Sequence, residues 1–216
     1  MILLYKYLLF DLDGTLTDPS IGITNSVAYA LSKFGINVED KRTLYKFIGP
    51  PLVDAFSEYY GFSKEDSEKA TAFYRETFSV KGLFENRVYD GVVEMLEALK
   101  NAGKRLIIAT SKPEPFTVKI LKHFDLLKYF DFVAAATFDS SRNSKDKVIA
   151  YALQSLDIKD RSEVVMIGDR HHDIDGAKEN GIDSIGVLWG FGSREELETS
   201  GATHIAESVQ QILKYV

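Results

Sequence analysis

The stretch LLFDLDGTLT, residues 8–17, places two carboxylates one residue apart at the end of an apolar run. Burying a charged group is costly unless the group is paired or holds a metal ion. Side chains alternate along an extended chain, so Asp11 and Asp13 point to the same side if the strand continues, and Gly14 permits a sharp exit. Taken alone, two neighbouring aspartates are equally compatible with one acid that caps a helix and another that lies in solvent. The other strand ends therefore decide its meaning.

The composition indicates one globular protein of ordinary type. The chain has 216 residues, 45% of them hydrophobic, which favours one large domain or a core with a smaller insert. The net charge of −6 argues against a nucleic-acid partner, and the lack of cysteine excludes disulfides and thiolate metal sites. No apolar run approaches the roughly 20 residues of a membrane span. We expect a cytoplasmic protein, monomer or homodimer, with no nucleic-acid or membrane partner.

Short apolar runs separated by helical patterns predict an α/β fold. Continuous apolar runs of this length are typical of parallel strands that are buried on both faces. The predicted strands are 7–10, 106–109, 132–136, 164–167 and 184–188. Between them, apolar residues recur at helical spacing, as in 92–99 and 149–156, which indicates right-handed crossovers in a Rossmann-like parallel sheet.

One interval, from about Pro19 to Arg87, contains helical patterns and no convincing strand. Predicted helices lie at 23–34, after Pro51, and at 65–78, and the sheet resumes after Asp90-Gly91. The sequence therefore predicts a helical cap at 19–85 inserted into a catalytic core of 1–18 and 86–216. Helical inserts at the carboxyl end of a sheet are natural lids, because ligands bind at that edge.

Polar residues follow two further predicted strands. The run 106–109 ends in Thr110, and the run 164–167 ends in Gly168-Asp169, with Asp173 four residues later. Because the carboxyl ends of parallel strands share one edge, these groups and the first two acids are expected to converge. Four converging carboxylates would repel one another unless a cation lay among them, and oxygen ligands without cysteine favour Mg²⁺.

These motifs resemble the haloacid dehalogenase superfamily of phosphohydrolases. The matching features are DLDGT after an apolar strand, a strand ending in Thr110, a lysine before a helix, and GDRHHD after another strand. The segments DGTLTD, YDGVVEMLEALKNAG and GVLWGFGSREEL are similar to its phosphoglycolate-phosphatase-like branch. The resemblance implies an enzyme that hydrolyses a small phosphomonoester, phosphoglycolate-like or a nucleotide. Within this family Asp13 argues against dehalogenation, because the dehalogenating members lack this second acid.

The resemblance implies a role for each acid. Asp11 would attack phosphorus and form an aspartyl-phosphate, while Asp13 would protonate the departing oxygen and later deprotonate water. The Asp11 carboxylate, the main-chain carbonyl of Asp13 and Asp169 would bind Mg²⁺, and Asp173 would be a further ligand or an outer-shell partner. Thr110 would bind a phosphoryl oxygen, helped by backbone groups near Ser111.

A lysine completes the family's phosphate site, and the sequence offers three candidates. In NSKDKVIAYAL we choose Lys145, just ahead of the predicted helix, over Lys147 in its first turn; Lys112 in TSKPEP is the third. The proline that commonly follows this lysine in the family is missing here. Gly49 and Arg75 of the insert are candidate substrate contacts. The histidines inside GDRHHD are expected to be solvated or outer-shell groups.

Two other functions are compatible with part of the pattern. A sugar-phosphate mutase of the same superfamily would return the phosphoryl group to a sugar. A receiver-type signalling domain also gathers acids, threonine and lysine at strand ends, but it has no use for an acid–base group such as Asp13 beside its phosphorylated aspartate. The sequence names no individual substrate: phosphoglycolate, a nucleoside monophosphate and pyrophosphate all stay open.

Overall fold

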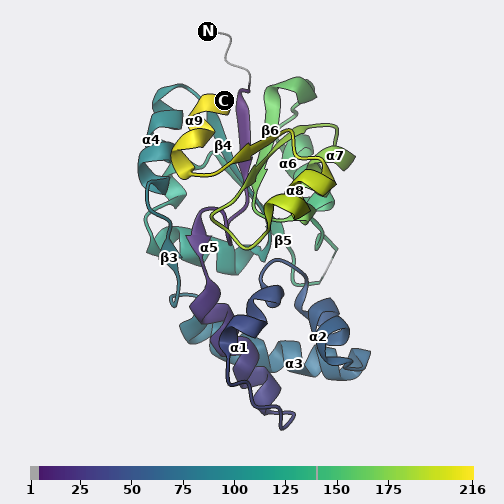
Figure 1. Cartoon of the computed structure of the whole chain (residues 1–216). Helices are drawn as coiled ribbons and strands as arrows, with labels where there is room; N and C mark the ends of the chain where they lie inside the picture. The colour runs from purple at the N-terminus through teal and green to yellow at the C-terminus, as the bar shows by residue number, and fades with distance from the viewer. Residues whose placement is uncertain (1–4, 140) are drawn as a thin grey trace. The chain divides into compact units, whose positions relative to one another are not determined.

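The chain forms two compact units in the computed structural model, which describes residues 5–139 and 141–216. One unit combines residues up to Thr17 with Val88–Val216, and the other is Asp18–Arg87 (Figure 1). The sequence patterns place the insert at 19–85. The short strands β2 (Thr17–Asp18) and β3 (Arg87–Val88) pair with each other where the chain passes from one unit to the other and back.

The first unit contains a six-stranded sheet in the order β5-β4-β1-β6-β7-β8, and its strand pairs are all parallel. The strands are β1 (Tyr7–Phe10), β4 (Arg105–Pro113), β5 (Phe132–Ala136), β6 (Val164–Gly168), β7 (Asp183–Val187) and β8 (His204–Ala206). The predicted α/β class is confirmed, and each of the five predicted strands is present. The edge strand β8 was not predicted because its three residues are too few and too incompletely buried to give an apolar run.

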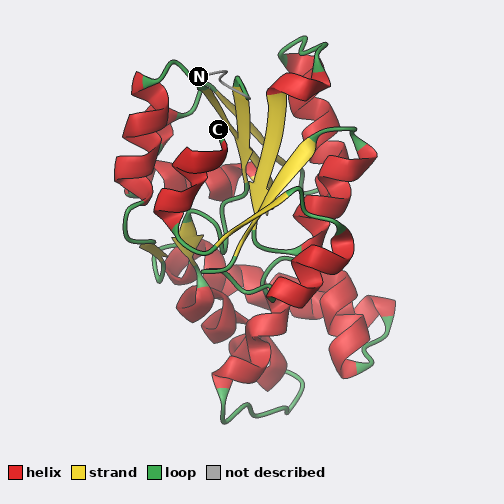
Figure 2. Ribbon diagram, turned by 45° about the horizontal axis from the view of Figure 1, so that its top comes forward, coloured by secondary structure: helices red, strands yellow, loops and turns green. Residues whose placement is uncertain are grey.

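Helices cover both faces of this sheet, which explains the continuous apolar runs. Figure 1 shows α6 (Lys145–Ser155) and α7 (His171–Glu179) on one side and α4 (Val92–Asn101) on the other, and Figure 2 shows the strands enclosed by helices. The apolar face of α6 packs into a cluster with alternate strand residues, which include Leu9, Ile107, Ala109, Ala134, Val164 and Met166. The other elements of this unit are α5 (Glu114–His123), η3 (Leu127–Tyr129), η4 (Arg161–Glu163), α8 (Arg194–Ser200), η5 (Val209–Gln211) and α9 (Ile212–Tyr215). The label η marks a short helix that is not an α-helix; η3, η4 and η5 are 3₁₀-helices.

The strand order creates a topological switch point at β1. From this central strand the chain builds outward through β4 and β5 on one side and through β6, β7 and β8 on the other. Ligands of open α/β sheets bind outside the carboxyl ends of strands at such a point. A ligand site is therefore expected at the carboxyl ends of β1, β4 and β6.

The second unit is helical, as predicted. It comprises α1 (Ser20–Ser32), η1 (Lys41–Phe47), α2 (Leu52–Tyr60), α3 (Lys64–Thr77) and η2 (Phe78–Gly82). Pro51 is the N-cap of α2 and not its first residue, a shift of one position from the expectation. Close packing of α1 on η2 depends on Gly22, where an added Cβ would lie 2.0 Å from the Gly82 carbonyl oxygen. Within residues 5–139 and 141–216, no helix has the length and apolar character needed to cross a membrane.

Candidate active site

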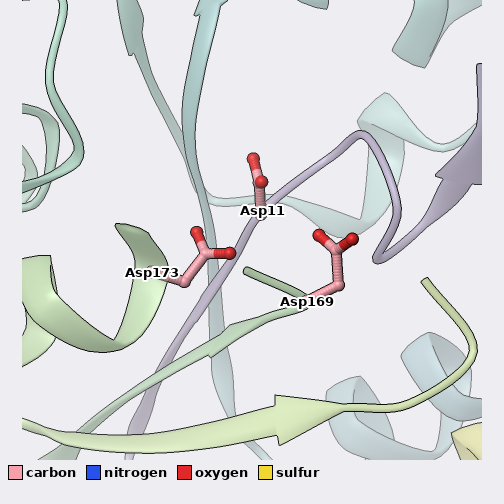
Figure 3. A group of neighbouring side chains, drawn as sticks. All are labelled: Asp11, Asp169 and Asp173. Carbon is pink, nitrogen blue, oxygen red and sulfur yellow. The ribbon is translucent and has the colours of Figure 1, made fainter. Parts of the chain in front are cut away.

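Three carboxylates from separate elements meet at the switch point. Asp11 follows β1, Asp169 follows β6, and Asp173 lies in the first turn of α7 (Figure 3). One oxygen of each lies within 4.8 Å of the others, and all three residues are buried. Two glycines make this approach possible. A Cβ on Gly14 would lie 2.2 Å from Asp169 Oδ2, and a Cβ on Gly168 would lie 2.1 Å from Asp173 Cγ.

Lys145 joins two of these carboxylates. Its Nζ lies 2.8 Å from Asp11 Oδ1 and 2.8 Å from Asp173 Oδ1, and it donates a hydrogen bond to the Ala109 carbonyl oxygen at 3.0 Å. Burial opposes the charge of the ammonium group, but the two acids outweigh burial and raise the pKa of Lys145. Lys145 is therefore a fixed cation at the centre of the site. Lys147, the neighbouring candidate, is exposed.

Asp13 pairs with a different lysine. Lys112 Nζ donates to Asp13 Oδ2, and both side chains are largely buried. Burial raises the pKa of Asp13, although Lys112 opposes the shift. Two of the three candidates for a phosphate-binding lysine thus have separate partners: Lys145 pairs with Asp11, and Lys112 pairs with Asp13. An acid whose pKa is raised by burial is suited to hold and release a proton.

Thr110 and Ser111 lie at the carboxyl end of β4. The pairing of β4 with β5 slips between Thr110 and Pro113, and this bulge turns the strand end out of the regular ladder. The buried Thr110 hydroxyl oxygen accepts a hydrogen bond from the Lys112 amide at 3.3 Å. Accepting through its oxygen leaves the hydroxyl hydrogen to donate to a ligand. Ser111 is half-buried beside it.

The site's charges and two of its buried oxygens fit a cation, since Asp13 Oδ1 and Asp169 Oδ1 both lack a hydrogen-bond partner among the described residues. Four carboxylates, those of Asp11, Asp13, Asp169 and Asp173, are accompanied by only two ammonium groups among the ion pairs of the described chain. Asp169 Oδ2 accepts from the Phe191 amide at 2.8 Å, whereas Asp169 Oδ1 is buried without a hydrogen-bond partner in the described residues. Burial, followed by the neighbouring acids, raises the pKa of Asp169 well above its usual range. A hard divalent ion such as Mg²⁺ would satisfy this oxygen and reverse that shift.

The histidines of GDRHHD are accounted for by contacts other than a metal. His171 Nδ1 lies 3.0 Å from Glu196 Oε1. The imidazole rings of His171 and His172 have centroids 3.8 Å apart. Burial, followed by neighbouring positive groups, lowers the pKa of His172 to about 4, so the ring is neutral at physiological pH. The metal-ligand group found among the described residues consists of aspartates alone.

Two predicted substrate contacts belong to the other unit. Gly49 lies between η1 and α2 with a φ of 111°, and Arg75 lies on α3, where it is exposed. The proposal that they contact substrate stays a prediction.

The segment Trp189–Glu196, to which no role was assigned from the sequence, contacts the motif loops. Trp189 Nε1 donates to the Thr15 carbonyl oxygen at 3.0 Å, and Glu196 accepts from the His171 amide at 2.8 Å. From the sequence, this segment was noted only because GVLWGFGSREEL resembles the phosphoglycolate-phosphatase-like branch of the family. Hydrophobic periodicity carries no signal for such contacts, because they run through backbone atoms and one half-buried acid.

Comparison with known proteins places this site in a family. Residues 8–187 match the family described as haloacid dehalogenase-like hydrolase. A 5'-nucleotidase of Pseudomonas aeruginosa is 46% identical over 200 residues, which are 93% of this chain and 90% of that protein. The tyrosine-protein kinase PtkA of Mycobacterium tuberculosis is 39% identical over 94% of this chain and 69% of its own length. The crystal structure of a predicted phosphatase from Clostridium acetobutylicum superposes with a TM-score of 0.95 at 50% identity, covering 98% of each chain.

The Rossmann-like sheet, with aspartates, a threonine and a lysine at its switch point, together with these comparisons defines the class as a phosphohydrolase. The chain belongs to the haloacid dehalogenase-like hydrolase family, and the protein is a phosphatase of that family. The resemblance inferred from LLFDLDGTLT and GDRHHD is thereby confirmed.

Proposed function

We propose that the protein hydrolyses a small phosphomonoester through an aspartyl-phosphate on Asp11, with Mg²⁺ as cofactor. The observation that carries the proposal is the convergence of Asp11, Asp169 and Asp173 within 4.8 Å, with Lys145 2.8 Å from Asp11. A site for an anionic ester needs compensating positive charge, and the carboxylates themselves supply the ligands for a divalent ion.

Asp11 and Asp13 have different roles in the reaction. An Asp11 oxygen forms a bond to phosphorus while the bond from phosphorus to the ester oxygen breaks, and Asp13 gives its proton to the departing oxygen. In the second half, Asp13 takes a proton from water as the water oxygen attacks phosphorus, which releases phosphate and restores Asp11. The raised pKa of Asp13 supports this role, since a carboxyl group must be protonated to act first as an acid.

Asp11, the main-chain carbonyl of Asp13 and the unpartnered oxygen of Asp169 would hold the cation. Bound Mg²⁺ would supply charge neutralisation for the phosphoryl group and for the acids around it. Asp173 accepts from the Arg170 amide at 3.1 Å and pairs with Lys145, so its main contribution is to position that lysine and the loop. Lys145 and Thr110 would bind the phosphoryl oxygens.

A nucleoside 5'-monophosphate is the first substrate to test, because the relative at 46% identity is named a 5'-nucleotidase. Phosphoglycolate and a sugar phosphate are the matched alternatives. Phosphate release from a panel of phosphorylated metabolites, each assayed with wild type and Asp11→Asn, tests the proposal. We expect Mg²⁺-dependent release that Asp11→Asn abolishes. Isomerisation of a sugar phosphate without free phosphate would indicate a mutase, and labelling of a tyrosine from ATP would indicate a kinase; either result without hydrolysis contradicts the proposal.

A further inference from the structure

The segment from Trp189 to Glu196 lies directly against Asp169. At Gly192 an added Cβ would lie 1.9 Å from the Asp169 carbonyl oxygen, and at Gly190 it would lie 2.4 Å from Asp169 Cβ. Real Cβ atoms do not approach other heavy atoms so closely, so the two positions require glycine for this contact. The glycines of WGFG therefore bring the backbone of this segment against the residue that offers an unpartnered oxygen to a cation.

This close approach decides which oxygen Asp169 presents. The Phe191 amide donates to Asp169 Oδ2 at 2.8 Å and so fixes the rotation of the carboxylate. Asp169 Oδ1 is left buried, without a hydrogen-bond partner among the described residues. Figure 3 shows the Asp169 carboxylate beside those of Asp11 and Asp173, and one oxygen of each lies within 4.8 Å of the others. A metal ligand that is oriented by a second hydrogen bond binds its ion more tightly than one that is free to rotate.

Glu196, at the far end of the segment, holds the loop that follows Asp169. Its Oε1 accepts from Arg170 Nε at 2.9 Å and from the His171 amide at 2.8 Å, and it lies 3.0 Å from His171 Nδ1. Glu196 is itself fixed at the start of α8, where its amide donates to the Ser193 hydroxyl at 3.1 Å. One carboxylate thus ties α8 to the residues between the two motif acids, Asp169 and Asp173.

We propose that Trp189–Glu196 is a positioning segment for the cation site, in which the Phe191 amide orients Asp169 and Glu196 holds the Arg170–His171 turn in place. The inference rests on the proposed metal-dependent function and adds a role that the family motifs do not assign. Glu196 is a positioning residue because its contacts are to the loop and not to the reacting atoms. Its contribution should therefore appear in the affinity for Mg²⁺.

The test is a calorimetric titration of the metal-free protein with MgCl₂, without substrate, on wild type, Glu196→Ala, Glu196→Gln and Glu195→Gln. Glu195 is the exposed neighbour of Glu196 in the same helical turn, so its variant controls for the loss of one negative charge. High ionic strength screens the remaining long-range effect of that charge. We expect Glu196→Ala to raise the Kd for Mg²⁺ roughly 10–100-fold, the usual effect of removing an outer-shell partner. Glu196→Gln keeps an acceptor for the His171 amide, so it should recover part of the affinity, and Glu195→Gln should bind as wild type does.

A Kd within twofold of wild type in folded Glu196→Ala and Glu196→Gln would overturn the inference, whatever their melting temperatures. If Glu196→Ala does not fold, Glu196→Gln decides by the same criterion. Failure of the wild type itself to bind Mg²⁺ would overturn the proposed cofactor as well, which separates the two failures. Activity provides a second readout: the Mg²⁺ concentration for half-maximal turnover should rise in the Glu196 variants, and saturating Mg²⁺ should restore turnover.

Discussion

Lys145 Nζ lies 2.8 Å from Asp11 Oδ1, although one residue begins α6 and the other follows β1. Both side chains are almost completely buried, so the ion pair is shielded from water. The same ammonium group lies 2.8 Å from Asp173 Oδ1. A buried cation shared by the proposed nucleophile and a motif acid forms an anion-binding point before any ester arrives.

Lys145→Met should therefore reduce turnover strongly. We expect a loss of roughly 10²–10³-fold, comparable to removing one preorganised electrostatic contact from a transition state. Lys147→Met is the matched control, because Lys147 is exposed on the first turn of the same helix and should be dispensable. Steady-state kinetics with p-nitrophenyl phosphate measure both. Equal losses in the two variants, or none in Lys145→Met, would contradict the assignment of the phosphate-binding lysine.

Substitution of each aspartate of DLDGT should block a different step of the reaction. Asp11→Asn removes the group that bonds to phosphorus, so no labelled phosphoenzyme should form. Asp13→Asn removes acid–base help and should cost roughly 10²–10⁴-fold in turnover. With a good leaving group such as p-nitrophenol, which needs little protonation, Asp13→Asn should still form the aspartyl-phosphate and then accumulate it. Quenched-flow labelling distinguishes them, and a labelled Asp11→Asn protein would show that the nucleophile is another residue.

Asp169→Asn should stabilise the metal-free protein while it weakens Mg²⁺ binding. Burial and nearby acids raise the pKa of Asp169, so the folded state resists the charged form. The resulting loss of stability begins as the pH rises above the unfolded pKa of about 3.9 and continues until the pH exceeds the raised folded pKa. A neutral asparagine avoids this loss, so Asp169→Asn should have the higher melting temperature in EDTA at pH 7. The difference should shrink toward pH 4; a lower melting temperature for Asp169→Asn at pH 7 would contradict the account.

Asp131 illustrates the opposite pH dependence. It accepts from the Leu106 amide at 2.9 Å and pairs with Lys100 at 3.0 Å and Arg105 at 3.2 Å. Burial opposes its charge, but these contacts prevail and lower the pKa of Asp131. Its stabilisation is therefore present above the unfolded pKa and is lost as the pH falls through the lower folded pKa.

Asp131→Asn should lower the free energy of unfolding by about 1 kcal/mol at pH 7, because solvent screens ion pairs of an exposed residue and asparagine keeps an acceptor for the Leu106 amide. Urea denaturation at pH 7 and at pH 3 measures the change, which should diminish at the lower pH. Glu65→Gln, which breaks an exposed pair with Lys69, is the control and should leave stability nearly unchanged. An equal effect of Asp131→Asn at both pH values would show that its charge is not responsible.

The sequence predicted the strands and the convergence of acids well, because both depend on local patterns. The apolar runs predicted β1 and β5 with their observed bounds. Because the carboxyl ends of parallel strands share one edge, Asp11 and Asp169 were expected to lie close together, and they do. The pairing of Lys112 with Asp13 was not predicted, since nothing local links a strand-end lysine to one particular acid. The role of Glu196 was missed for the same reason: its partners are backbone and side-chain donors of a distant loop.

The requirement for a divalent cation tests the central claim most directly. Protein stripped with EDTA and dialysed should release no phosphate from p-nitrophenyl phosphate, and added Mg²⁺ should restore turnover in wild type but not in Asp169→Asn. Mg²⁺ would then be acting through Asp169, whose buried Oδ1 has no hydrogen-bond partner among the described residues. Full turnover by the stripped wild-type protein without any divalent ion, or full Mg²⁺-dependent turnover by Asp169→Asn, would contradict the account.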